Sequence, residues 1–227
     1  MKKIILGRVL AFGLMFGMAC TMMPNTVIKA AVESNSTEED TVEIGNNEIT
    51  SYEQLESKLS NVEDVSKDDN GIIYVKMNKN IVGRICFDIE DAHIIFDGNG
   101  KTVSNFRMYQ PSWDFGGLFG VVENAEITDL KVKPGHVITV KENGGILAGR
   151  AKHSVIRNVT VNGTLRTTGT VGGVTADVLE DSVVENCVSD HVAIDAGSGK
   201  EIFIGGIAGR ASESLIADCE VNTGDSL

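Results

Sequence analysis

The sequence has little of the residues that mark several protein classes. Its 227 residues include only three prolines, four cysteines and one tryptophan, and aromatic residues make up 5%. The 25 glycines follow no three-residue period, which excludes collagen. With 42% hydrophobic and 23% charged residues, the chain is neither disordered nor a polytopic membrane protein. Many glycines and few prolines favour a fold with many tight turns.

Positive charge is also scarce. Lys and Arg number 20 against 32 Asp and Glu, which gives a net charge of −12 at pH 7. Binding to nucleic acid needs clustered cations that neutralise phosphates, so this balance argues against a nucleic acid partner. The length allows one large domain or two small ones, with enough interior for a hydrophobic core.

The N-terminus has the features of an export signal. A positive start at residues 2–8 precedes an apolar stretch from Val9 to Met23, and small residues follow at Ala30 and Ala31. The apolar stretch is too short for a comfortable membrane span, so we predict a secretory signal peptide over residues 1–30. Its removal takes away four basic residues and leaves 16 basic against 32 acidic ones, a net charge of −16. This charge is typical of a dispersed, exported protein.

Cysteine usage and missing motifs exclude several kinds of site. Once Cys20 leaves with the signal peptide, Cys86, Cys187 and Cys219 remain, and an odd number is not a disulfide framework. A lipoprotein signal at Cys20 is disfavoured because Gly17 stands where a leucine is expected. The chain has no C-x-x-C pair, no G-x-S-x-G motif and no phosphate-binding loop. The sequence therefore predicts no metal, no cofactor and no catalytic residue.

Two short regions precede the main body of the chain. Residues 31–48 are rich in Glu, Ser, Asn, Thr and Asp and predict an acidic, flexible linker. Ser51 and Gln54 have the spacing of a helix capping box, and a short helix follows. Its apolar face is formed by Tyr52, Leu55 and Leu59. From residue 71 apolar residues alternate as in strands, so residues 49–115 are expected to hold an N-terminal cap and the first strands.

The most informative feature is an internal repeat over residues 116–227. It begins each time at a glycine pair, and the pairs are Gly116-Gly117, Gly144-Gly145, Gly172-Gly173 and Gly205-Gly206. A strand-like stretch follows, in which an Asp or Asn (Asp129, Asn158, Asn186, Asp218) precedes an apolar residue (Leu130, Val159, Cys187, Cys219). Four matched copies indicate a repeat protein, and the last copy has no polar cap.

One repeat of about 28 residues is too short to bury its own apolar face, so the copies must stack. Stacking at about 4.8 Å satisfies backbone groups between coils. We therefore predict an all-β protein, a right-handed parallel β-helix with three strands per turn. One interior column is expected to contain Ile127, Ile156, Val184 and Ile216. A leucine-rich repeat is the rival, but the L-x-x-L-x-L spacing is missing.

The repeat also predicts what occupies its corners. The glycine pairs are expected where the chain needs positive φ or a close backbone approach. The Asp and Asn column is expected to satisfy backbone groups at a corner, rather than to bind calcium. Cys187 and Cys219 are expected in adjacent coils as two free, buried thiols, because stacked side chains point the same way.

A resemblance to a known family rests on three short segments. Phe96–Val103 reads F-D-G-N-G-K-T-V, Gly117–Gly120 reads G-L-F-G, and Gly145–Gly149 reads G-I-L-A-G. This pattern resembles the GLUG-repeat family of bacterial surface proteins, over roughly residues 70–227. The resemblance implies a secreted or cell-surface, adhesin-like protein. GLUG repeats also occur in IgA-protease-type metallopeptidases, outside the catalytic unit. Their H-E-x-x-H motif is absent around His93, His136, His153 and His191, so protease activity does not carry over.

Carboxylates offer the one enzymatic alternative. Parallel β-helices include polysaccharide lyases and hydrolases, which gather carboxylates and a basic residue on one outer face. The candidates here are Asp177, Asp181, Asp190 and Asp195, with Arg150 and Arg210 one coil to either side. Because acidic residues occur throughout the chain, we interpret them as a solvated acidic face with occasional ion pairs.

Aromatic residues give the strongest indication of binding. Five of the twelve lie between residues 106 and 119, and Phe119 is expected to point inward with the repeat. Tyr109 and Trp113 lie in a polar loop and could offer flat faces to a sugar ring or a partner protein. The alternative is that this loop folds back over the edges of the coils.

The sequence as a whole predicts a non-catalytic, secreted or cell-surface module with an adhesin-like binding or structural role. Its ligand-binding residues are expected to be Tyr109 and Trp113, and its partner a host glycan or an extracellular protein. A carbohydrate-active β-helix enzyme is the alternative. A third interpretation is the N-terminal piece of a larger surface protein or protease.

Overall fold

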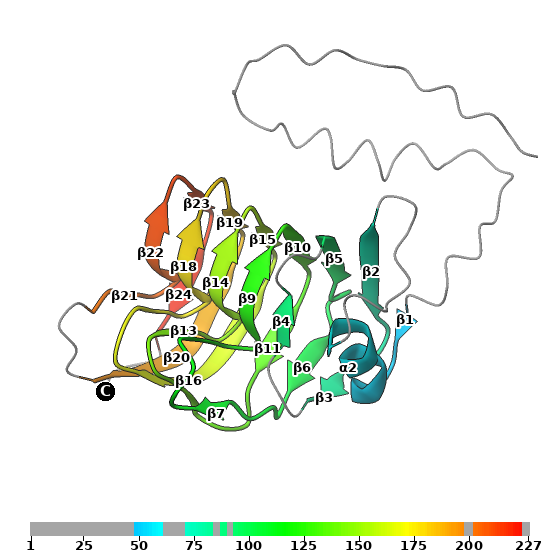
Figure 1. The fold of residues 1–227 in the computed structure, drawn as a ribbon, viewed down its shortest axis with the longest axis horizontal. Helices are drawn as coiled ribbons and strands as arrows, with labels where there is room; N and C mark the ends of the chain where they lie inside the picture. The colour runs from blue at the N-terminus through cyan, green and yellow to red at the C-terminus, as the bar shows by residue number, and fades with distance from the viewer. Residues whose placement is uncertain (1–47, 61–70, 84–86, 90–92, 198–201, 224–227) are drawn as a thin grey trace, which may run out of the picture. The chain divides into compact units, whose positions relative to one another are not determined.

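The computed structural model describes residues 48–60, 71–83, 87–89, 93–197 and 202–223 (Figure 1). The predicted signal peptide, nearly all of the predicted linker and Cys86 lie outside the described residues. Glu48, assigned to the linker by composition, instead begins the first strand. No helix in the described part of the chain is long and apolar enough to cross a membrane.

The described strands form four parallel sheets that wind into a solenoid of about five turns. Sheet A contains β1 (Glu48–Ile49), β2 (Ile72–Met77), β5 (His93–Asp97), β10 (Ala125–Thr128), β15 (Val155–Arg157), β19 (Val183–Glu185) and β23 (Leu215–Ala217). Sheet B contains β3 (Ile81–Val82), β6 (Thr102–Ser104), β11 (Lys131–Lys133), β16 (Thr160–Thr167), β20 (Val188–Ala196) and β24 (Glu220–Asn222). Beside the second half of β16 lies β12 (Ile138–Val140), and β7 (Tyr109–Gln110) pairs with β12.

The other two sheets complete each turn. Sheet C contains β4 (Phe87–Ile89), β9 (Phe119–Glu123), β14 (Ala148–Lys152), β18 (Thr175–Leu179) and β22 (Ala208–Ser212). Sheet D is short and contains β8 (Phe115–Gly116), β13 (Asn143–Gly145), β17 (Val171–Gly172) and β21 (Ile204–Gly205). The chain visits sheets D, C, A and B in turn. Sheet D is a fourth face that the prediction of three strands per turn did not include.

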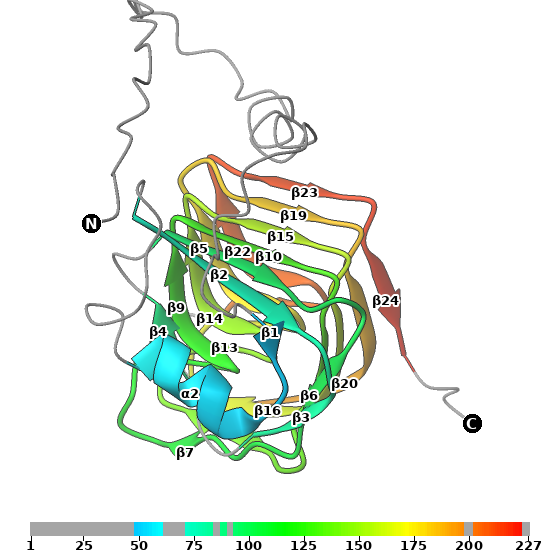
Figure 2. The same cartoon turned by 90° about the vertical axis from the view of Figure 1, so that its right-hand side faces the viewer.

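The winding is right-handed, as predicted. Figure 2 looks along the solenoid with α2 (Tyr52–Ser60) in front, and the chain runs from sheet C through A to B clockwise as it recedes. A parallel β-helix is thereby confirmed as the fold class. This hand follows from the preference of parallel crossovers for right-handed connections.

The predicted interior column exists and is longer than the repeat suggested. Parallel pairing aligns Ile127 with Ile156, then Val184, then Ile216, and it extends the column back to Phe96 and Val75. Ile127, Ile156 and Val184 are completely buried. The prediction was wrong for Ile216, which is 38% exposed because β23 is the last described strand of sheet A and has a neighbour on one side only.

The Asp and Asn column forms the corner between sheets A and B, as predicted. Asp129, Asn158, Asn186 and Asp218 all have φ between 51° and 53°. This left-handed region is accessible to Asp and Asn at low cost. The first three amides bond to the next coil: Asp129 N–H donates to Arg157 O at 3.1 Å, Asn158 N–H to Glu185 O at 3.2 Å and Asn186 N–H to Ala217 O at 3.2 Å. The column therefore satisfies backbone groups at the corner.

The glycine pairs serve close packing rather than positive φ. None of them adopts a positive φ. At Gly117 a Cβ would lie 2.6 Å from Gly145 O and 2.8 Å from Leu147 O, so only glycine fits between the coils. Sheet D aligns Gly144 with Gly116 but Gly145 with Gly172, so the third copy pairs one residue earlier than equal spacing predicts.

The two ends of the solenoid differ. At the N-terminal end α2 buries the predicted face of Tyr52, Leu55 and Leu59, and Ser51 Oγ accepts the Gln54 N–H at 3.3 Å. The Gln54 side chain reaches back to Thr50 N at 2.7 Å, one residue before the predicted capping-box partner. At the other end, Ile204, Leu215 and Val221 are 59%, 53% and 47% exposed.

Candidate binding surface

The part of sheet B formed by β7, β12 and the C-terminal halves of β16 and β20 presents a row of side chains to solvent. Tyr109 pairs with Thr139, Thr139 with Arg166, and Arg166 with Asp195, one residue from each successive coil. Ile138, Val140 and Leu165 alternate with this row and are buried. Since successive residues of a strand point to opposite faces, the row faces outward. Tyr109 is 61% exposed.

Trp113 lies in a turn that the next coil anchors. Trp113 N–H donates to Gln110 O at 3.0 Å, and Trp113 O accepts the Lys141 N–H at 2.9 Å. Lys141 Nζ also contacts Asp114 Oδ1 at 2.9 Å. Backbone hydrogen bonds thus hold the loop against the edge of the next coil, yet Trp113 remains 43% exposed. We call Tyr109, Trp113, Thr139 and Arg166 the sheet B platform.

The remaining aromatic residues of the cluster have other roles. Phe106 and Phe119 are buried, and Phe119 points inward as predicted. Phe115 packs under Arg150, whose guanidinium carbon lies 4.1 Å from the ring centroid. Only Tyr109 and Trp113 of the five are exposed large hydrophobic residues.

Three exposed cations lie near the sheet B platform. Lys131 and Lys133 occupy the outward positions of β11, and Arg107 lies two residues before Tyr109. Lys131 stands between Thr102 and Thr160, and Lys133 beside Ser104. None of the three forms an ion pair or a side-chain hydrogen bond with the described residues. These three cations were not among the predicted binding residues, although the alternation Lys-Val-Lys at 131–133 marks two outward cations.

The candidate catalytic carboxylates do not share a face. Asp177 lies on sheet C, Asp190 and Asp195 lie on sheet B, and Asp181 lies between β18 and β19. Asp195 pairs with Arg166 at 2.8 Å, and Asp190 Oδ1 contacts His191 Nδ1 at 2.7 Å. In the described part of the chain, no three His, Cys, Asp or Glu side chains gather as for a metal ion.

Asp177 contradicts the prediction of a solvated acidic face. Its side chain is completely buried between arginines from the two neighbouring coils, which the sequence placed correctly. Arg210 donates from Nε to Oδ1 at 3.1 Å and from Nη2 to Oδ2 at 2.9 Å, and Arg150 Nη2 lies 3.7 Å away on the other side. Fork-like pairing of an arginine with a carboxylate fixes the relative orientation of the two side chains. The row of Arg150, Asp177 and Arg210 therefore has a structural role.

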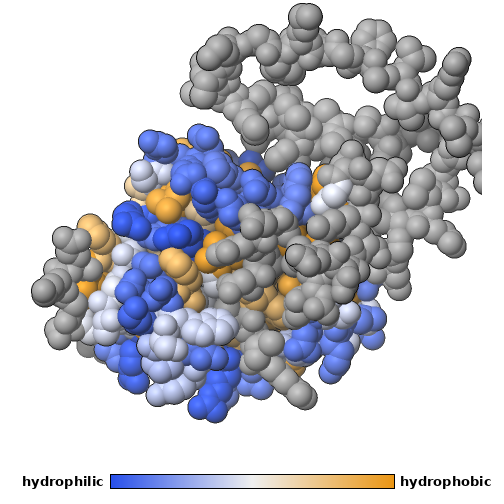
Figure 3. Space-filling model, in the orientation of Figure 1, coloured by the Kyte–Doolittle hydropathy of each residue, from blue (hydrophilic) through white to orange (hydrophobic). Residues whose placement is uncertain are grey.

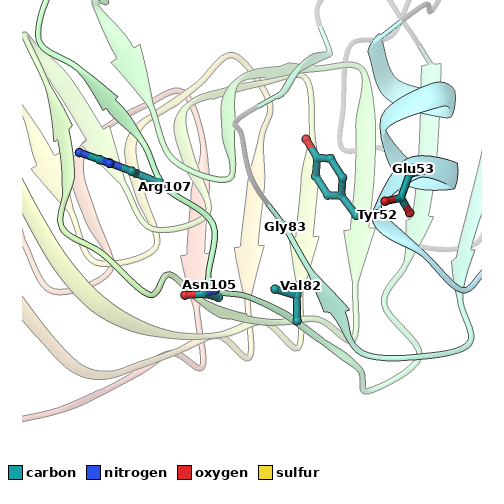
Figure 4. Close-up of a pocket in the computed structure, with 6 residues that line it drawn as sticks. All are labelled: Tyr52, Glu53, Val82, Gly83, Asn105 and Arg107. Atoms are coloured by element: carbon teal, nitrogen blue, oxygen red, sulfur yellow. The ribbon is translucent and has the colours of Figure 1, made fainter.

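A hollow of about 410 Å³ lies beside α2. Tyr52, Glu53, Val82, Gly83, Asn105 and Arg107 line it (Figure 4). In Figure 4 the Arg107 side chain extends away from α2 and from Glu53. Arg107 is therefore shared by the hollow and the group of exposed cations.

The two repeat cysteines lie in adjacent coils as free thiols, as predicted. Cys187 N–H donates to Cys219 Sγ at 3.4 Å. Cys187 is buried, and its burial raises the pKa of the thiol to about 12. Cys219 is only half-buried, contrary to the prediction, because it belongs to the last described coil.

Comparisons with family models, with curated proteins and with solved structures return no match to this chain. The similarity to GLUG repeats therefore stays a prediction from the sequence.

Proposed function

We propose that this protein is a non-catalytic, secreted or cell-surface module that binds a glycan or an extracellular protein through the sheet B platform. The observation that carries the proposal is the exposed Tyr109 in register with Thr139 and Arg166, with Trp113 anchored to the next coil. Large aromatic side chains are usually buried, so two exposed ones on one edge of a rigid sheet favour recognition.

The rigidity of the platform supports this proposal. Backbone pairing holds Tyr109, Thr139 and Arg166 before any ligand arrives, so binding does not have to order the backbone of these strands. An aromatic face with neighbouring hydroxyl and guanidinium groups suits a sugar, whose ring stacks while its hydroxyls accept and donate hydrogen bonds. Export through the signal peptide would bring this surface to extracellular ligands.

An enzyme that cleaves glycans is the alternative. The positions of the carboxylates support this alternative less well than the platform supports a binding module. General acid–base chemistry needs two carboxyl groups on either side of one bond. Asp177 and Asp195 lie on different sheets, and two arginines enclose Asp177. A role as part of a larger surface protein is compatible with the same binding surface.

The proposal is tested with the chain from residue 31 on glycan arrays and in pull-downs of extracellular matrix proteins. Tyr109→Ala and Trp113→Ala should each weaken the signal about tenfold. Phe203→Ala is the matched control, because Phe203 is an aromatic residue directly before β21 of sheet D and is 46% exposed. A signal that all three variants leave unchanged would refute the platform. Release of reducing ends that Asp177→Asn or Asp195→Asn abolishes would establish the enzyme instead.

A further inference from the structure

Sheet B carries an uneven distribution of charge. On its described strands the Lys and Arg residues are Lys131 and Lys133 of β11 and Arg166 of β16, and Arg107 and Lys141 lie beside β7 and β12. The acidic residues on the described strands of sheet B are Asp190, Asp195 and Glu220, all on β20 and β24. In a protein with a net charge of −12, the cations of sheet B therefore lie on β11 and β16, apart from the acids of β20 and β24, and Arg107 lies two residues from Tyr109.

The cations of this area differ in whether an acidic side chain neutralises them. Asp114 and Glu142 neutralise Lys141, and Asp195 neutralises Arg166. Arg107, Lys131 and Lys133 have no such partner among the described residues and are exposed. Unpaired cations on an acidic protein attract an anionic group more strongly than cations that already have a partner.

The spacing of these groups suits an extended ligand. Lys131 and Lys133 project from the same face of β11, about 7 Å apart along the strand. Thr102 and Thr160 flank Lys131 on neighbouring strands, about 4.8 Å to either side, with hydroxyl groups that donate and accept hydrogen bonds. Figure 3 shows hydrophilic and neutral colours along the lower edge near β7 and a hydrophobic area near β21. The surface offers charge, hydroxyl groups and an aromatic ring together.

We propose that the ligand of the sheet B platform is an anionic polysaccharide. Its acid groups pair with Lys131, Lys133 and Arg107, and its sugar rings lie on Tyr109 and Trp113. This inference rests on the proposed function and adds the chemical class of the ligand. Neighbouring hydroxyls on the same sheet bond to the sugar hydroxyls between the acid groups.

A polysaccharide fits this surface better than the other polyanions. Duplex nucleic acid carries one charge per about 1.7 Å of its axis, and three free cations neutralise little of that while the acidic remainder of the protein repels it. A lipid surface attracts clusters of about four to eight cations, often on an amphipathic helix. Only three cations of this area are unpaired among the described residues, and the apolar face of α2 is buried in the solenoid. A glycan spaces its acid groups by whole sugars, so a few cations suffice.

The experiment measures the affinity for polygalacturonate, dextran sulfate and neutral dextran in 50 mM and 200 mM NaCl. The first two polymers distinguish carboxylate from sulfate as the charged group. The wild-type protein should bind at least one anionic polymer and bind neutral dextran at least tenfold more weakly. Affinity for the anionic polymer should fall with added salt because ions screen exposed charges.

The double variant Lys131→Gln/Lys133→Gln should lose about fivefold to tenfold in affinity at 50 mM NaCl. Its control is Lys76→Gln/Lys152→Gln, which removes the same charge from sheets A and C and should change affinity less than twofold. Arg107→Gln should add to the loss of the first variant.

The outcomes separate this inference from the proposed function. Equal binding of neutral and anionic polymers that Tyr109→Ala still weakens overturns the anionic ligand and leaves the binding module intact. Tighter binding of duplex DNA or of anionic lipid vesicles also overturns the inference. Absence of binding to every polymer and matrix protein, with no effect of Tyr109→Ala, overturns both.

Discussion

At the scale of single residues, the most consequential charged group is Asp177. Its carboxylate lies in register between Arg150 and Arg210, so one acid joins three successive coils of sheet C. An unpaired buried charge is costly, and here both oxygens of Asp177 have arginine partners. The row of Arg150, Asp177 and Arg210 therefore fixes the register of β14, β18 and β22 in a way that a solvated acid could not.

Asp177→Asn should lower the free energy of unfolding by about 1–3 kcal/mol, because it removes the buried partner of two arginines. Asp195→Asn is the control, since it breaks the exposed pair with Arg166 and should cost less than about 1 kcal/mol. Urea unfolding followed by circular dichroism measures both. Equal losses for the two variants would contradict the structural role of Asp177.

Cys187 predicts a pH dependence of stability. Its pKa is about 12 in the folded protein and ordinary in the unfolded chain. As the pH rises, the thiol therefore ionises in the unfolded chain before it ionises in the folded protein. The unfolded state therefore binds fewer protons between pH 9 and 12, and stability falls as pH rises through this range. At pH 10 the loss is about 1.4 kcal/mol relative to pH 8. Between these two pH values, the free energy of unfolding of Cys187→Val should therefore fall by that much less than that of the wild-type protein. The same pH profile of stability in both proteins would contradict the argument.

At the scale of elements, the solenoid depends on columns of apolar side chains rather than on any one strand. Most of its strands have two to six residues, too short to be stable alone. A strand inside a sheet gains backbone partners on both sides, and its buried side chains join a column of side chains from the neighbouring coils. The contribution of a column residue therefore depends on its place along the axis.

Ile156→Ala and Ile216→Ala test this dependence within one column. Ile156 is completely buried between Ile127 and Val184, and its truncation should cost about 2–5 kcal/mol. Ile216 is 38% exposed in the last described coil, and the same change should cost less than about 1.5 kcal/mol. Thermal or urea unfolding gives both values. A larger loss at Ile216 would contradict the burial assigned to the two coils.

The columns and the A–B corner could be predicted from the sequence because both are periodic. Ile127, Ile156 and Val184 repeat once per coil, and so do Asp129, Asn158 and Asn186. The burial of Asp177 could not be predicted, because it depends on side chains from two other coils. The short sheet D was missed because glycine pairs resemble turns in sequence, whereas here they allow close packing of paired strands.

The binding surface was predicted only in part. Tyr109 and Trp113 were identified by their concentration in a polar loop, and both are exposed. Their neighbours Thr139 and Arg166 lie about 30 and 57 residues further along the chain, and only strand register brings them beside Tyr109. The cations at 131 and 133 could have been found from the Lys-Val-Lys alternation.

At the scale of the whole described molecule, the two ends of the solenoid differ in how far their apolar side chains are covered. Helix α2 covers one end with Leu55 and Leu59, while Ile204, Leu215 and Val221 stay exposed at the other. In repeat proteins each coil gains stability from its direct neighbours, so a coil with one neighbour opens more readily. The solenoid should therefore be least stable at β22, β23 and β24.

Hydrogen exchange measured by mass spectrometry should show this gradient. Amides of β10, β15 and β19 should exchange slowly, with opening free energies near that of global unfolding. Amides of β23 and β24 should exchange at least tenfold faster at the same pH. Uniform protection from β10 to β24 would contradict the exposure of the last described coil.

The central claim is that sheet B binds an anionic glycan through the platform and its unpaired cations, and an exchange footprint tests it most directly. The protein is compared with and without saturating polygalacturonate or dextran sulfate, whichever binds more tightly. Added protection should fall on residues 102–115 and 131–141, which contain β6, β7, β11 and β12, and should spare sheet C. Protection centred on sheet C, or none at any concentration of either polymer, would contradict the claim.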